Sequence, residues 1–71
     1  MENITTESNV IIGMKAAYNA IQDYAKQRRD SLTFLANSTE PEFPEFAAKL
    51  RERAVAMEEV VDAIDNILSI I

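Results

Sequence analysis

The stretch TEPEFPEFAAKL, residues 39–50, contains both prolines of a chain that otherwise favours helix. A proline excludes helical backbone angles from the residue before it, so Pro41 predicts that a first helix has ended by this point. Pro44 suits the first turn of a second helix, where its missing N–H would have had no partner. The stretch therefore predicts a turn between two helices, with Phe43 and Phe46 closing the turn end of their contact.

The same stretch has an alternative reading as a proline-rich docking ligand of the PxxP type. Such a ligand is an extended polyproline segment and usually carries a nearby base. Here Glu40, Glu42 and Glu45 are interleaved with the prolines and aromatics. We therefore interpret the stretch as a turn, a helix start and an aromatic plug against Leu35.

Hydrophobic residues recur at steps of three and four on both sides of the turn, the spacing of one helical face. The 71 residues include 48% hydrophobic residues and a single glycine, Gly13, and form one domain, 1–71. We expect a first helix over about 7–36, an elbow over 37–43 and a second helix over about 44–70. The first stripe consists of Ile11, Met14, Tyr18, Ile21, Ala25, Arg28, Leu32 and Leu35, and only the arginine breaks it.

The second helix has a wider apolar face than a two-stranded contact requires. Its stripe consists of Phe43, Phe46, Leu50, Arg53, Met57, Val60, Ile64, Ile67 and Ile71. A further row, seven residues apart, runs beside it: Ala47, Ala54, Val61 and Leu68. The predicted fold class is all-α: an antiparallel two-helix hairpin completed as a four-helix bundle by dimerisation or by a partner.

Composition excludes several classes of function. A net charge of −5 argues against direct nucleic-acid binding, which needs clustered bases. With no cysteine and no histidine, the chain lacks the commonest metal ligands, and we expect no cofactor. No apolar run approaches the ~20 residues of a membrane span, and the acidic start is unlike a secretion signal. These features predict a soluble, cytoplasmic protein.

Enzymatic function is not expected either. Without histidine or cysteine, activation of a nucleophile would rest on lysine, tyrosine or carboxylate groups. A two-helix hairpin offers no enclosed pocket that would shift their pKa values. We therefore assign no catalytic residue.

Arg28 and Arg53 fall on the apolar stripes, and the expected pairing of the helices brings them nearly opposite each other. One interpretation is that their stems pack on the contact while their heads reach Glu52 or a carboxylate of another subunit. The other is an anion-binding site assembled in an oligomer, since guanidinium groups match phosphate or carboxylate bidentately.

Apolar residues beyond the inner stripes predict a surface for partners. The candidate partner-binding residues are Ile12, Phe34, Val61, Ile67, Leu68 and Ile71. The predicted function is protein–protein binding, as an adaptor, inhibitor or small chaperone, in a homo-oligomer of two or more chains or in a complex. The alternative is an oligomeric binder of a small anionic ligand, such as a nucleotide, held by Arg28 and Arg53.

Overall fold

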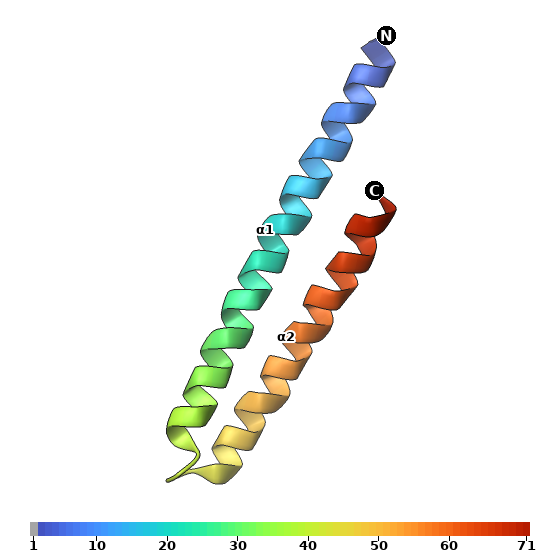
Figure 1. The fold of residues 1–71 in the computed structure, drawn as a ribbon. Helices are drawn as coiled ribbons and strands as arrows, with labels where there is room; N and C mark the ends of the chain where they lie inside the picture. The colour runs from blue at the N-terminus through green and yellow to red at the C-terminus, as the bar shows by residue number, and fades with distance from the viewer. Residues whose placement is uncertain (1) are drawn as a thin grey trace.

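The protein is a hairpin of two long antiparallel helices (Figure 1). The computed structural model describes residues 2–71, with side chains from residue 8 onward. Helix α1 spans Glu2–Thr39 and helix α2 spans Pro44–Ile70, and the two pack along their length. The all-α class and the antiparallel hairpin are confirmed. The Cα atoms extend over 63 × 15 × 11 Å, so the molecule is a single layer two helices wide.

Helix α1 is longer than the expected range of 7–36 at both ends. At its C-terminal end the hydroxyls of Ser38 and Thr39 donate to the carbonyls of Phe34 and Leu35 at 2.9 and 2.8 Å. These polar side chains therefore bond within the helix instead of turning the chain, and α1 continues to Thr39. The turn is correspondingly shorter than 37–43 and consists of the four residues Glu40–Phe43.

Helix α2 begins at the position that the second proline favours. Pro44 occupies the first turn, and Glu45 places a carboxylate near the positive end of the helix dipole. Phe43 is the N-cap residue, with φ −134° and ψ 70°, and its side chain makes no capping hydrogen bond. The Phe43 N–H donates to the Thr39 carbonyl at 2.7 Å, which ties the start of α2 to the end of α1.

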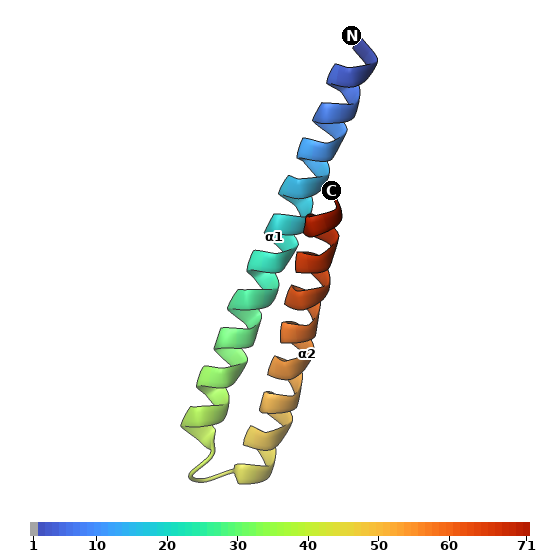
Figure 2. The same cartoon turned by 45° about the vertical axis from the view of Figure 1, so that its right-hand side comes forward.

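The N-terminal part of α1 projects beyond the C-terminal end of α2 (Figures 1 and 2). The cause is length, because α1 has 38 residues and α2 has 27. Val10 and Ile12 in this projecting segment are 55% and 63% exposed. A Cβ atom added at Gly13 would meet nothing within 4 Å. Within the hairpin, Gly13 therefore serves no close approach of a neighbouring helix.

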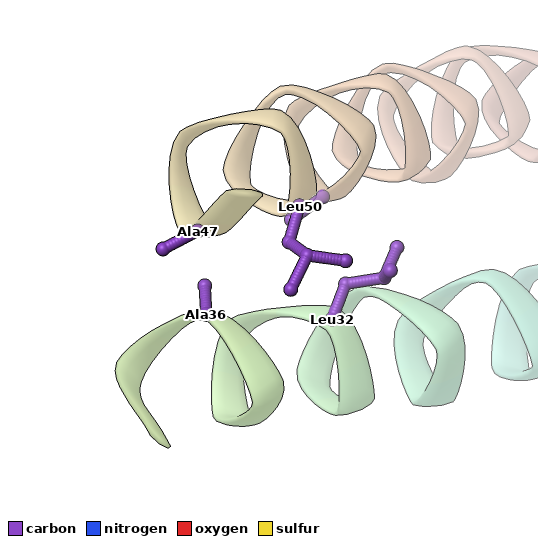
Figure 3. Close-up of a cluster of buried hydrophobic side chains, with 5 residues drawn as sticks. Leu32, Ala36, Ala47 and Leu50 are labelled. Carbon is purple, nitrogen blue, oxygen red and sulfur yellow. The ribbon is translucent and has the colours of Figure 1, made fainter. Parts of the chain in front are cut away.

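The core is one narrow row of side chains on each helix. Buried side chains on α1 are Gln22, Ala25, Leu32 and Ala36, and those on α2 are Ala47, Leu50, Ala54, Val61 and Ile64. These positions step by three and four, the heptad pattern of a two-stranded coiled coil. Ala36 and Ala47 are completely buried, and Figure 3 shows them on the facing sides of the two helices beside Leu32 and Leu50.

The contact row on α1 is rotated from the expected stripe. Gln22, Arg29 and Ala36 face α2 where Ile21, Arg28 and Leu35 were expected, and Leu35 is 46% exposed. On α2 the row that begins with Ala47 lies in the contact, and the row that begins with Phe46 does not.

The short turn and the two alanines explain this rotation. A four-residue turn holds the helix axes close together, and the distance between packed helices depends on the side chains at their contact. Alanine at both sides of the turn end permits that close approach. The expected aromatic plug is therefore wrong: Phe43 and Phe46 are 59% and 54% exposed.

Candidate interaction surface

The two sides of the helix contact differ in chemistry. The residues in the contact occupy heptad positions a and d, and all of those listed here are buried or half-buried. The a positions are 22, 29 and 36 on α1 and 47, 54, 61 and 68 on α2. The d positions are 18, 25, 32 and 39 on α1 and 50, 57, 64 and 71 on α2. In an antiparallel pair, the e positions of both helices lie on one side of the contact and the g positions on the other. Thr33, Arg51 and Glu58, all at e, do line one shallow hollow together.

The side formed by positions e and b, the polar flank, is held together by hydrogen bonds between the helices. Buried Gln22 donates to the Val61 carbonyl at 3.0 Å and to Asp65 Oδ1 at 2.6 Å. Arg29 donates to Glu58 on the opposite helix and to Asp30 on its own. Because the buried amide of Gln22 has both partners, it is satisfied at this register.

A second arginine closes the polar flank near the turn. Arg51 donates to Glu40 Oε2 at 2.8 Å and to Asn37 Oδ1 at 3.1 Å. This hydrogen bond and the nearby positive charge lower the pKa of the Glu40 carboxyl. The hydrogen bond that Arg29 donates to Glu58, and then the one that it donates to Asp30, raise the pKa of Arg29. These pairs are partly exposed, so water screens them and they fix the alignment of the helices more than they stabilise the fold.

Among the side chains that the structure describes, from residue 8 onward, the side formed by positions g and c, the apolar flank, carries no carboxylate. Its members on α1 are Val10, Met14, Ala17, Ile21, Tyr24, Arg28, Ser31, Leu35 and Ser38. Its members on α2 are Phe46, Lys49, Arg53, Ala56, Val60, Ala63, Ile67 and Ile70. Over residues 8–71 the flank therefore follows both helices from the projecting segment to the turn and carries three charges, all positive.

Most of the large exposed hydrophobic side chains lie on the apolar flank. Among the side chains that the structure describes, thirteen large hydrophobics are exposed and eight of them are flank members. These eight are Val10, Met14, Ile21, Tyr24, Leu35, Phe46, Val60 and Ile70. Scattered exposed hydrophobics are ordinary, whereas their concentration on one side of the contact makes that side a candidate interaction surface.

The six predicted partner-binding residues occupy different environments. Val61 is 4% exposed in the helix contact, so its side chain is not available to a partner. Leu68 and Ile71 are half-buried in the same contact row, and Ile67 is a half-buried member of the apolar flank. Phe34, 69% exposed, lies at an f position bordering this flank, and Ile12 lies on the projecting segment away from it.

Arg28 and Arg53 are both exposed and lie on the apolar flank, not in the helix contact. The observed register does not place them opposite each other, because the hydrogen bonds from Gln22 to Val61 and Asp65 put Arg28 about level with Met57, one helical turn beyond Arg53. Within the region whose side chains are described, neither forms a salt bridge, and neither belongs to the hollow on the polar flank or to the one at the turn. The arginines that do line a hollow, Arg29 and Arg51, are paired with carboxylates.

Sequence reasoning missed the polar flank altogether. Its signal was present in the heptad: Arg51, Glu58 and Asp65 recur seven apart at e positions. It also missed an open hollow at the turn, lined by Phe43, Pro44 and Phe46 together with Glu42, Glu45 and Lys49.

Comparison of the chain with protein-family models, with curated proteins and with solved structures finds no match in any of the three. Across residues 2–71, neither helix combines the length and the apolar character needed to cross a membrane. The argument for function therefore rests on the surface of the hairpin.

Proposed function

We propose that this chain acts by binding protein, and that its apolar flank is the binding surface. Helices of the partner would lie along the flank and complete a four-helix bundle, in which each helix has two neighbours. An adaptor, an inhibitor and a small chaperone all act through a surface of this kind. The observation that carries the proposal is the concentration of exposed hydrophobic side chains on one side of the helix contact.

The exposed area supports the proposal. A compact monomer of 8.0 kDa is expected to expose about 4,450 Å². The hairpin exposes 5449 Å², an excess of about 1,000 Å² over that expectation. A specific protein–protein interface of standard size buries about 800 Å² on each partner. The excess is therefore close to one interface.

Protein binding is better supported than binding of a small anion through Arg28 and Arg53. An anion site needs guanidinium groups that converge on one point and are shielded from water. These two arginines lie at different levels of an open flank. Their surroundings are hydrophobic side chains such as Leu35 and Val60, which match another protein surface better than a nucleotide.

Photo-crosslinking in the source cell tests the proposal with a matched pair of valines. A photoreactive amino acid replaces either Val60 on the apolar flank or Val55 on the polar flank, both of which are exposed. We expect protein adducts from position 60 and at most a trace from position 55. Equal yields at the two positions, or adducts from position 55 alone, would contradict the proposal.

A further inference from the structure

We propose that the protein covering the apolar flank is a second copy of this chain, packed with both turns at the same end of the bundle. This inference rests on the proposed function and names its partner. The excess exposed area is about that of one side of a standard interface. A two-fold dimer uses the same patch on both chains, so a single flank on each chain is sufficient.

Two-fold symmetry allows two ways of placing one flank on the other. In the first, the turns lie at opposite ends, and each α2 packs on the α2 of its partner. In the second, the turns lie at the same end, and each α2 packs on the α1 of its partner. The choice between them is made by the charges that border the flank at position f.

The border of the flank on α2 is acidic, whereas the border on α1 is uncharged. Glu45, Glu52 and Glu59 form the α2 border, seven residues apart. The α1 border consists of Gly13, Ala20, Gln27 and Phe34. Turns at opposite ends would place one acidic row beside the other, and like charges across an interface are strongly disfavoured. Turns at the same end place each acidic row beside an uncharged row.

The same-end arrangement also supplies the exposed Arg28 with a carboxylate. A two-fold axis parallel to the helices preserves height along the bundle, so residues level within one chain stay level between chains. Gln22 bonds to Val61 and Asp65 within the hairpin, which sets that level. On this register Glu59 of the second copy lies within about 3 Å of the level of Arg28, within reach of its side chain, twice per dimer by symmetry.

Side-chain sizes along the flank fit the same register. The c positions nearest in height across the interface pair Tyr24 with Ala63 and Ala17 with Ile70. Each of these pairs joins a large side chain with a small one, the alternation that lets facing layers interdigitate. Between them, the c position nearest in height to Ser31 is Ala56, so both members are small at mid-flank.

Single cysteine variants test this arrangement, because the native chain has no cysteine. Ser31→Cys and Ala56→Cys place thiols at exposed flank positions, and Ala48→Cys places one on the polar flank as a control. Separately purified variants are mixed in equal amounts and oxidised mildly, with circular dichroism to verify that each keeps its helices. A disulfide requires Cα atoms within about 7 Å, so bond formation reports proximity.

We expect the mixed disulfide between Ser31→Cys and Ala56→Cys to exceed each homodisulfide by at least about ten-fold, with none formed between Ser31→Cys and Ala48→Cys. Predominant homodisulfides would overturn the same-end arrangement. A native chain that stays at 8.0 kDa at micromolar concentration, with no disulfide in any mixture, would overturn the second copy as occupant. In that case adducts of another protein at position 60 would still support the proposed function, and their absence would remove it as well.

Discussion

The polar flank and the apolar flank are built from the same two helices, yet only one of them is complete within the chain. On the polar flank, Gln22, Arg29 and Arg51 donate across the hairpin to Val61, Glu58 and Asn37 on the other helix. On the apolar flank, side chains such as Ile21 and Val60 remain exposed. The hairpin therefore aligns its helices by its own hydrogen bonds and leaves hydrophobic side chains exposed on the other side, which we propose are covered by protein.

The largest expected effect comes from placing a charge on each flank in turn. Val60→Glu should weaken self-association by at least about one hundred-fold, because it buries an unpaired carboxylate in both halves of the interface. Val55→Glu, beside Arg51 on the polar flank, should change it by less than about three-fold. Sedimentation equilibrium over a concentration series measures both. Similar losses for the two variants would remove the distinction between the flanks.

The next effect concerns the buried amide on the polar flank. Gln22→Ala should lower the free energy of unfolding by about 1–2 kcal/mol, because it removes two hydrogen bonds and leaves a gap. Gln22→Leu should be neutral or stabilising, since leucine fills the same space and water can hydrate the Asp65 carboxylate in place of the amide. Urea unfolding of the two variants measures the difference. If leucine destabilised as much as alanine, the amide would contribute more than packing and alignment.

A smaller and local effect is expected in the projecting segment of α1, which extends beyond the end of α2. Gly13→Ala should stabilise helix there by about 1 kcal/mol, because no neighbour obstructs a new Cβ atom. Amide exchange of residues 8–14 should slow by about five-fold, while the midpoint of global unfolding hardly moves. Faster exchange in this segment would mean that the glycine is needed by a neighbouring helix.

The smallest effect is the acid titration of the polar flank. Arg51 lowers the pKa of Glu40, so this pair stabilises the fold above the ordinary glutamate pKa and loses that contribution as pH falls through the lowered value. Arg51→Gln should return the Glu40 pKa to its ordinary range, as an NMR titration of the carboxyl carbon would show. An unchanged Glu40 pKa would mean that the pair does not form in solution.

Sequence alone predicted the hairpin but not which residues face its contact. Two heptad rows overlap on α1 and share Tyr18, Ala25 and Leu32, so periodicity cannot distinguish Ile21 from Gln22 as the next member. Hydrophobicity favours the isoleucine. The structure selects the glutamine, because the glutamine and the alanine of the same row fit a close approach set by a short turn.

The same ambiguity moved the candidate surface. The large residues assigned to the core, including Leu35, Phe46 and Val60, became members of the apolar flank, and Val61 left the surface for the core. The chain does carry more hydrophobic surface than the two-helix contact buries, but the exposed residues differ from those predicted. Turn length and helix separation are properties of the packed hairpin and cannot be read from local periodicity.

The molar mass of the native chain in solution tests the central claim most directly. If a second copy covers the apolar flank, sedimentation at micromolar concentration should give twice the 8.0 kDa of one chain, with dissociation on dilution accompanied by loss of helix. A monomer of 8.0 kDa that unfolds cooperatively, at a midpoint independent of concentration, would contradict it.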